Sequence, residues 1–553
     1  MPPRRYPDRP IFWLALWLAV NLLQAAFTPL DPDETYYWMY SRFLDWGYFD
    51  HPPAVAVLIA AGKDLLPGAL GLRFGHVIAG GLTLTVVYEL LGRPRGNALV
   101  LAVALTFAQP LLEVYGFIAT PDGPLLLFTA LYLLALQRFL RQPGWSASLV
   151  LGFTMAGLLY SKYHGVILIF FTALPHLWFL LRTPQAWVAA GTGLVLFLPH
   201  LYWQYVHDYP SFRYHLSGRD DPYQWKFTWQ YLVNQLLIFS PLLLVYYVRA
   251  WRVSIPADRF HRSLRWLIAG TLLFFLYTTT KGRTEAQWTA MLSVPLVLLT
   301  YRAVRERPAA FRGLRTSAWI TIGLLVVARL LLVTPRDWLP FSKPFDHEPW
   351  VQRLAAVARN RPVMVENSYR FASLYEFYSG GQPGWTMTNV DYRPSQYDIW
   401  RRDSLYHERE VLVLGQTNWE RPAADSFAMQ KGYMLVQSVQ DFQVVKDVRL
   451  EIESVENDTI RIYATAPRPI QLTGSLPLGL RVIGRRTDGS FLYRRVALAG
   501  RTAIPAHRRT LLYSGPNPLG AEWRAERIRL GAGLAYAGMP PLRGQSALLD
   551  HPE

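Results

Sequence analysis

The chain has 553 residues, of which 51% are hydrophobic and 17% are charged, and its formal net charge is +17. The 20 Trp, 31 Tyr and 28 Phe exclude a disordered or collagen-like chain, and the absence of Cys excludes disulfide frameworks and thiolate metal sites. Such a charge is compatible with nucleic-acid binding, whereas a mean hydropathy of +0.11 favours a membrane protein. The position of the charges along the chain therefore decides the class of protein.

The first 335 residues contain eleven apolar segments, each of which predicts a membrane-spanning helix. They are 11–27, 72–91, 98–115, 123–139, 146–160, 165–181, 186–203, 231–248, 266–279, 286–301 and 317–334. A soluble protein can bury one or two such helices, but eleven joined by short loops indicate a polytopic α-helical membrane domain of about 11–13 transmembrane helices. Segment 53–66 is the first candidate for an additional span, although Lys63 and Asp64 favour a helix on the membrane surface.

The arginines between these segments gather on one side of the predicted membrane. If the N-terminus is cytoplasmic, the cytoplasmic pieces with Arg138 hold 18 Arg and only three acidic residues. Most acidic residues of the first 335 then lie in the opposite loops. Because an excess of Arg and Lys marks the cytoplasmic side, we expect a cytoplasmic N-terminus and an outer location for everything after residue 334. The net charge is thus a topology signal, and we expect no nucleic-acid partner.

The last third of the chain has shorter apolar runs. A strand at 361–365, a helix at 368–378 and a strand at 411–414 predict a small α/β domain. Several predicted strands follow, beginning at 433–437, and indicate a β-rich domain. We therefore expect three domains, which are a membrane domain over 1–335, an extracytoplasmic α/β domain over 336–425 and an extracytoplasmic β-rich domain over 426–553.

The first outer loop begins with the densest group of acidic residues in the chain. Asp31, Asp33 and Glu34 follow the first predicted span directly. Carboxylates at a membrane surface can act as a general base or bind a cation. The alternative is structural, because Asp31 or Asp33 is a suitable N-cap for a helix over 34–43. The two roles are compatible, and the sequence leaves both open.

The same loop ends in a rigid corner, Gly-Tyr-Phe-Asp-His-Pro-Pro at 47–53. The two prolines prevent a helix from continuing through it. Asp50 and His51 precede them, and such a pair either forms a structural hydrogen bond or contributes to a divalent metal site. No cofactor is certain from the sequence, and a divalent metal ion is the one candidate.

Basic residues also occur in the outer loops, against the overall charge bias. Lys162 lies in a short outer turn, and Lys281 and Arg283 lie in another. Ammonium and guanidinium groups suit phosphate oxygens, so a phosphate-binding role is predicted. The alternative is that these cations extend from helix ends toward water. Asp122 opens the fourth predicted span in a Thr-Pro-Asp sequence.

These motifs, in this order, resemble the polytopic GT-C glycosyltransferases of the protein O-mannosyltransferase type (glycosyltransferase family 39), which include the bacterial aminoarabinose transferase acting on lipid A. The resemblance covers about residues 10–400. It rests on Asp33-Glu34, the corner at 47–53, Thr120-Pro121-Asp122, Ser-Lys-Tyr-His-Gly at 161–165, the turn at 281–288, and 366–369 with 373–378.

The resemblance implies transfer of a sugar from a polyprenyl-phosphate donor to a glycolipid, polysaccharide or protein on the outer face of the bacterial inner membrane, with inversion. It implies that Asp33 is the catalytic acid/base and that Glu34 assists. With the charge argument, Lys162, Lys281 and Arg283 would hold the donor phosphate. The remaining candidate substrate-binding residues are Asp50, His51, Asp122, Tyr163, His164, Glu285 and Trp288.

One position departs from the aminoarabinose branch, in which a Glu-Lys pair precedes the two prolines. This chain has Asp50-His51 there, and His51 can bind phosphate as a cation only when protonated. The difference argues against aminoarabinose as donor and lipid A as acceptor. Two other functions compete with sugar transfer: a transporter or flippase of lipid-linked sugars, and an outer-face binding protein whose β-rich domain is the active part.

Overall fold

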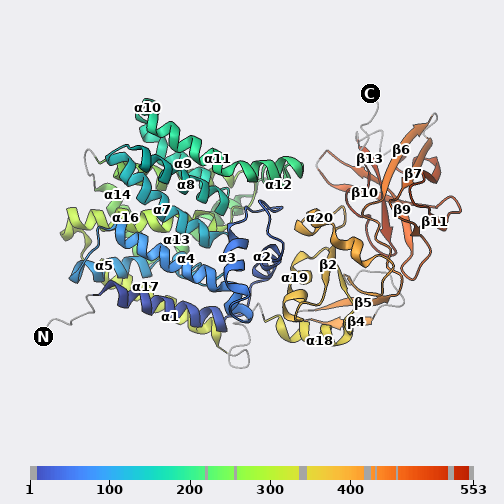
Figure 1. Ribbon diagram of the computed structural model, residues 1–553, viewed down its shortest axis with the longest axis horizontal. Coiled ribbons are helices and arrows are strands. Elements are labelled where there is room, and N and C mark those ends of the chain that lie inside the picture. Colours follow the sequence, from blue (N-terminus) through green and yellow to red (C-terminus); the bar gives the residue numbers. More distant parts are fainter. Residues whose placement is uncertain are drawn as a thin grey trace. The chain divides into compact units, whose positions relative to one another are not determined.

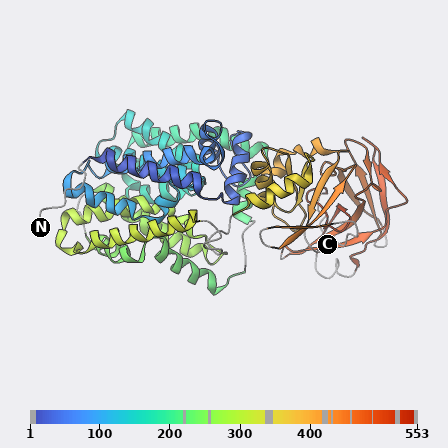
Figure 2. The same ribbon diagram turned by 90° about the horizontal axis from the view of Figure 1, so that it is seen from below.

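The computed structural model describes residues 9–217, 222–253, 258–334, 346–415, 425–429, 432–455, 459–487, 489–520 and 528–546. The chain forms two compact units, Met1–Phe345 and Asp346–Glu553. The first unit is built from helices and the second contains the strands (Figures 1 and 2). This arrangement confirms the predicted class, a polytopic helical domain followed by an α/β and β-rich region.

Most helices of the first unit fall on the predicted apolar segments, but several of these segments are divided between shorter helices, and α2 and α12 lie outside them. They are α1 Pro10–Phe27, α2 Pro32–Arg42, α3 Ala54–Lys63, α4 Gly68–Leu90, α5 Gly96–Phe107, α6 Pro110–Val114, α7 Asp122–Arg141, α8 Trp145–Ser161, α9 Gly165–Ala173, η1 Leu174–His176, α10 Leu177–Leu181, α11 Pro184–Val206, α12 Pro210–Ser217, α13 Trp225–Ile238, α14 Pro241–Arg252, α15 Arg259–Thr278, η2 Ala286–Leu292, α16 Ser293–Glu306, η3 Pro308–Phe311 and α17 Leu314–Val333.

Five of the described helical stretches are long and apolar enough to cross a membrane: α1, α4, α7, α11 and Pro308–Val333. A sixth is formed if α13 and α14 count as one span, but the two helices meet at 92°. The prediction of one straight span over 231–248 is therefore wrong. Ser240 has a φ of 64°, and Pro241 follows it, so the helical hydrogen-bond pattern stops there.

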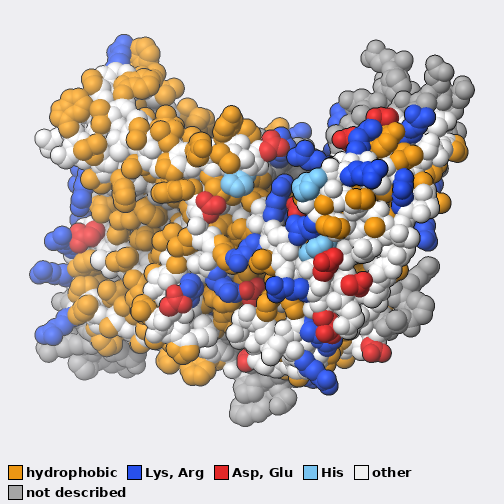
Figure 3. Space-filling view, turned by 45° about the vertical axis from the view of Figure 1, so that its right-hand side comes forward, with side chains coloured by type: hydrophobic (Ala, Val, Ile, Leu, Met, Phe, Trp, Pro, Cys, Tyr) orange, Lys and Arg blue, Asp and Glu red, His pale blue; other side chains and the backbone are white. Residues whose placement is uncertain are grey.

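Large apolar side chains on the outside of the first unit suit a lipid environment. Leu23, Trp187, Leu273 and Leu324 each expose more than 60% of their surface. Apolar side chains cover much of this unit in the space-filling view, whereas Lys and Arg are frequent on the second unit (Figure 3). An apolar exterior of this size is unfavourable in water and favourable against acyl chains.

Close contact between α3 and α4 depends on glycine. A Cβ atom at Gly75 would lie 2.0 Å from the backbone oxygen of Leu58, which cannot move without shifting α3. We expect Gly75→Ala to reduce stability by about 1–3 kcal/mol, because overpacking forces the two backbones apart. Thermal unfolding of the purified protein measures this. Gly191→Ala on α11 is the matched control, since nothing lies within 4 Å of the added methyl group; equal melting temperatures of the two variants would contradict the prediction.

The second unit begins with a five-stranded sheet of order β2-β1-β3-β5-β4. Strand β1 (Val363–Glu366) is parallel to β2 (Gly384–Met387) and β3 (Val411–Gly415), whereas β5 (Tyr433–Val439) runs antiparallel to β3 and to β4 (Asp425–Ala428). Helices α18 (Glu348–Ala358), α19 (Tyr369–Tyr378) and α20 (Gln396–Trp400) belong to the same part. The sheet therefore continues past residue 425, where the domain boundary was expected.

Three antiparallel sheets complete this unit. Their orders are β10-β9-β13, β12-β7-β6 and β11-β8. The strands are β6 Arg449–Val455, β7 Thr459–Thr465, β8 Ile470–Gln471, β9 Leu478–Arg485, β10 Phe491–Val496, β11 Ala503–Ile504, β12 Thr510–Pro516 and β13 Arg529–Tyr536. In β9, Leu480 and Val482 are buried and alternate with the more exposed Arg481, as expected for a sheet with one face in the core.

Candidate active site

The acidic group after α1 forms the N-terminus of α2. Asp31 is the N-cap, and its Oδ1 accepts a hydrogen bond of 2.8 Å from the backbone N–H of Asp33. The Glu34 carboxylate returns to accept from the backbone N–H of Asp31 at 2.9 Å. This reciprocal capping box satisfies donors that a helix start otherwise leaves open. The structural role left open by the sequence thus belongs to Asp31 and Glu34.

Glu34 also forms a buried ion pair with Arg73 of α4. Arg73 Nε lies 2.7 Å from Oε1 and Nη2 lies 2.5 Å from Oε2, and both side chains have no exposed surface. The backbone N–H of Ala119 donates to Oε1 at 2.8 Å. Each carboxylate oxygen therefore accepts two hydrogen bonds. These contacts give Glu34 a structural role in holding the loop, and its catalytic assistance stays a prediction.

Arg73 extends this anchor to the end of α1. Its guanidinium donates to the backbone oxygens of Ala25, Thr28 and Pro29 at 3.0, 2.7 and 3.1 Å. Sequence reasoning missed Arg73, although an arginine inside an apolar segment is itself a signal, because such a charge requires buried partners. The arginine and Glu34 together fix the start of α2 against α1, α4 and the loop before α7.

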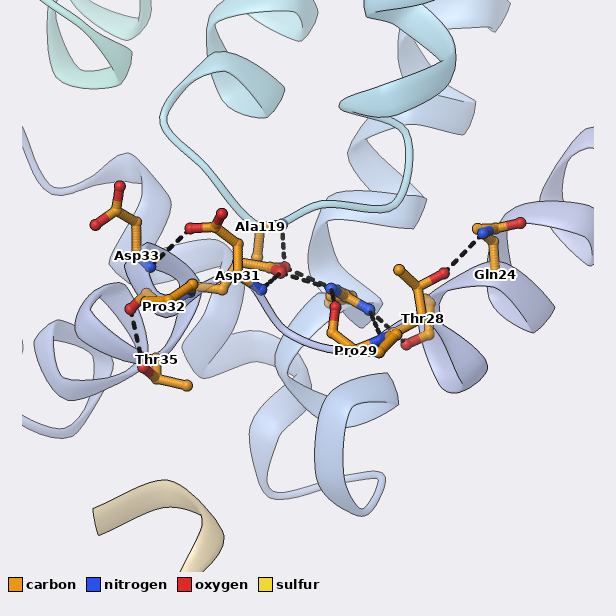
Figure 4. Close-up of polar contacts among 11 residues, drawn as sticks. Gln24, Thr28, Pro29, Asp31, Pro32, Asp33, Thr35 and Ala119 are labelled. Atoms are coloured by element: carbon orange, nitrogen blue, oxygen red, sulfur yellow. Dashed lines mark hydrogen bonds and ion pairs between the residues drawn. The ribbon is translucent and has the colours of Figure 1, made fainter. Parts of the chain in front are cut away.

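Asp33 lies on the first turn of α2 and is half-buried. Its side chain points away from Thr28 and Pro29 (Figure 4). The capping box uses the backbone N–H of Asp33, not its carboxylate. Asp33 therefore lies on a backbone that the capping box holds rigid.

The corner at 47–53 is held mainly by aromatic residues. Asp50 is buried, and its Oδ1 accepts a hydrogen bond of 2.7 Å from the Tyr40 hydroxyl. Burial and the neighbouring Asp50 carboxylate raise the pKa of Tyr40, so the phenol stays protonated and donates. The Tyr40 ring stacks on Tyr48 at 4.0 Å, and the ring of His51 lies 5.5 Å from that of Tyr37. Asp50 thus makes a structural hydrogen bond, one of the two roles considered for it.

The described residues contain no group of three or more His, Cys, Asp or Glu side chains arranged to hold a metal ion. Asp50 and His51 accordingly do not form a metal site with a third ligand in that part of the chain.

Helix α11 ties the first outer loop to the rest of the site. Trp203 Nε1 donates to Asp45 Oδ2 at 2.8 Å, and His200 Nδ1 lies 2.7 Å from the backbone oxygen of Trp46. His200 Nε2 and Gln204 Nε2 each lie 3.1 Å from the Tyr163 hydroxyl. Sequence patterns did not single out these α11 residues. His200 and Trp203 belong to an ordinary apolar segment, Gln204 directly follows it, and all three meet the loop only in the folded chain.

Lys162 and Asp122 form a second buried pair. Nζ lies 2.8 Å from Asp122 Oδ1 and 2.9 Å from Oδ2, and the two side chains are 8% and 6% exposed. The charge of Lys162 is therefore already compensated by Asp122 before any phosphate binds. An ammonium group has three donors, and these two bonds leave one available.

The turns at 161–165 and 281–288 meet through aromatic contacts. The ring of His164 lies 5.4 Å from that of Trp288 and 5.2 Å from that of Phe275. Lys281 and Arg283 are exposed; Arg283 Nε lies 3.5 Å from Glu285 Oε1. The three cations predicted to bind phosphate are therefore unlike, since one is buried and paired and two face outward.

Comparisons with known proteins agree with this architecture. Residues 50–203 match the family described as dolichyl-phosphate-mannose-protein mannosyltransferase. The match includes Asp50, Asp122 and Lys162, and excludes Asp33 and the turn at 281–288. Lipid A galacturonosyltransferase RgtD of Rhizobium johnstonii is 24% identical over 304 residues, which are 50% of this chain and 61% of that protein. The chain thus spans about three fifths of this curated relative.

Two solved structures share the fold. ArnT from Cupriavidus metallidurans superposes in the apo state with a TM-score of 0.57 and 15% identity, covering 77% of this chain and 97% of ArnT. The same protein bound to undecaprenyl phosphate superposes with a TM-score of 0.56, at the same identity and coverage. The chain therefore has the ArnT fold, and residues 50–203 carry the mannosyltransferase family pattern, in agreement with the predicted resemblance to GT-C glycosyltransferases of family 39.

Proposed function

We propose that this protein is an enzyme that transfers a sugar from a polyprenyl-phosphate donor to a glycolipid, polysaccharide or protein at the outer face of the bacterial inner membrane. The observation that carries the proposal is Asp33, an acid placed on a helix start that Asp31, Glu34 and Arg73 hold rigid. The dolichyl-phosphate-mannose description of the matched family and the undecaprenyl phosphate bound to ArnT support a lipid-phosphate donor, and the similarity to the lipid A galacturonosyltransferase RgtD supports a glycolipid acceptor. A cytoplasmic N-terminus and an outer second unit are part of the proposal.

In this proposal, Asp33 removes the proton of the acceptor hydroxyl. The acceptor oxygen forms a bond to the anomeric carbon while the bond from that carbon to the phosphate oxygen breaks. The proton stays on the Asp33 carboxylate, and the polyprenyl phosphate leaves with the electron pair. One displacement of this kind inverts the anomeric configuration. Cations that meet the departing phosphate stabilise its developing charge, which is commonly a large part of catalysis.

Lys281 and Arg283 are the cations proposed to meet that phosphate, with Lys162 contributing its remaining N–H. The other proposed substrate-site residues make contacts that shape the two turns and the corner, and most of them are proposed to act in this way. They are Asp50, His51, Asp122, Tyr163, His164, Glu285 and Trp288. Substitution of the exposed Lys281 and Arg283 is the better test of the phosphate role, because it leaves the buried contacts of the site intact.

We expect Lys281→Ala combined with Arg283→Ala to lower kcat/KM for the lipid-linked donor by about 10–100-fold, since two charge-assisted contacts to phosphate are lost. Initial rates at varied donor concentration measure this. Lys226→Ala, which removes an exposed lysine outside both turns, is the control and should keep the wild-type value. A double variant with unchanged kcat/KM would contradict the phosphate role of the pair.

Mass spectrometry of envelope glycolipids and glycoproteins, with and without the protein, tests the function as a whole. The proposal requires one sugar mass to disappear from an acceptor when the protein is absent. Purified protein should then form the same glycosidic bond from the lipid-linked donor. Movement of lipid-linked sugar across a bilayer without a new glycosidic bond would instead indicate the flippase alternative.

A further inference from the structure

A cleft in the second unit carries an unusual concentration of positive charge. Its volume is about 750 Å³, within the range of roughly 300–1,000 Å³ that ligand sites occupy. Separate segments of the chain bring cationic side chains to it, which are Arg401, Lys446, Arg449, Arg468 and Arg543, with His507 beside them. Because these segments are distant in sequence, the charge is a product of the fold and not of one basic run.

The acidic side chains in the cleft compensate only part of this charge. Lys446 Nζ lies 3.5 Å from Asp398 Oδ1, and Arg468 Nη2 lies 3.1 Å from Asp447 Oδ2. Arg401, Arg449 and Arg543 form no ion pair with a carboxylate of the described residues. Arg543 is attracted by the nearby Asp398 and Asp391 carboxylates without pairing with either. The gathered guanidinium groups are thus only partly compensated, and a bound anion would relieve the remaining repulsion.

Arg543 is the most firmly positioned of the three. Its Nη2 donates to the backbone oxygens of Val390 and Tyr392 at 2.5 and 2.6 Å. Burial lowers the pKa of Arg543, so its charge is poorly solvated by water. Arg401 and His507 both have left-handed backbone conformations, with φ of 50° and 54°. Such conformations cost free energy for residues other than glycine and gather at ligand sites.

The composition of the lining narrows the class of ligand. Among the described residues that line the cleft, none is Phe, Tyr or Trp and His507 carries the single ring, so the cleft offers a base or an aromatic peptide side chain little surface for stacking. The cleft is much larger than one phosphate ion. Asp398 and Asp447 offer acceptors for hydroxyl groups next to the guanidinium donors, a combination that suits a ligand with many hydroxyls and a few negative charges.

We propose that this cleft binds an anionic saccharide, with Arg401, Arg449 and Arg543 holding its phosphate or carboxylate groups. This site is additional to the transfer site proposed in the first unit, and binding to it can be measured without any transfer. Loss of one activity is therefore distinguishable from loss of the other.

The test uses the full chain in nanodiscs of phosphatidylcholine, which has no net charge. Calorimetry measures binding of a bis-phosphorylated disaccharide, of trigalacturonate and of neutral maltotriose. We expect at least one anionic probe to bind at least about tenfold more tightly than maltotriose, and added salt to weaken it. If only the phosphorylated or only the carboxylated probe binds, the result identifies the anionic group that the cleft recognises. If both anionic probes bind no more tightly than maltotriose, the proposal is overturned.

Arg401→Gln combined with Arg449→Gln removes two exposed charges and should weaken anionic binding at least about tenfold. Arg359→Gln with Arg501→Gln is the matched control, because both arginines are exposed in the same unit but do not line the cleft. Melting temperatures establish that both double variants are folded. The proposal fails if the two double variants bind the anionic probes equally well.

Discussion

Asp33→Asn is expected to reduce the transfer rate by about 10²–10⁴-fold, the usual contribution of a general base, while the protein still inserts and folds. The amide cannot accept the hydroxyl proton, but the capping box is kept because it uses the backbone N–H of Asp33. Product formation from a lipid-linked donor, followed by mass spectrometry, measures the loss.

Asp31→Asn is the matched control for this prediction. Asn is as good an N-cap as Asp, so the start of α2 is preserved and only a carboxylate next to Asp33 is removed. We expect this variant to keep most of its activity. An active Asp33→Asn enzyme would refute the proposed role of Asp33, and equal losses in both variants would assign the effect to the acidic group as a whole.

Glu34→Gln is expected to cause the largest loss of stability, about 3–5 kcal/mol, because it leaves the positive charge of Arg73 buried without a counter-charge. Thermal unfolding in detergent measures the change. Glu89→Gln makes the same substitution in the exposed pair with Arg93 and should cost no more than about 0.5 kcal/mol. Equal melting temperatures for the two variants would contradict the anchoring role of Glu34.

The membrane helices were largely predictable because hydropathy is a local property. The predicted segments 11–27 and 123–139 correspond to α1 and α7 within two residues at each end. The bend between α13 and α14 was not predicted, since a window of hydropathy averages over Ser240 and Pro241. The continuation of the five-stranded sheet past residue 425 was not predicted either, because the pairing of β5 with β3 is a contact between residues distant in sequence.

The sequence was sufficient to predict several residues of the candidate site, but not the residues with which they interact. The sequence singled out Asp33, Asp122 and Lys162, but the ion pair between the last two depends on two helices meeting. Arg73 was missed, as were His200 and Trp203. A charged side chain in an apolar segment indicates a buried partner of opposite charge, as the pairing of Arg329 with Glu113 at 2.7 Å also illustrates.

The four hydrogen bonds to the Glu34 carboxylate have a consequence for biosynthesis. Its partners lie at residues 31, 73 and 119, so the acidic loop cannot reach its final geometry until the chain has been inserted as far as the segment before α7. A ribosome that has delivered only α1 leaves Asp33 on a loop without Arg73, and delivery of α4 still leaves the hydrogen bond from Ala119 unmade. Fragments intended to reassemble into a working protein should therefore be divided after residue 119, so that one piece carries all three partners.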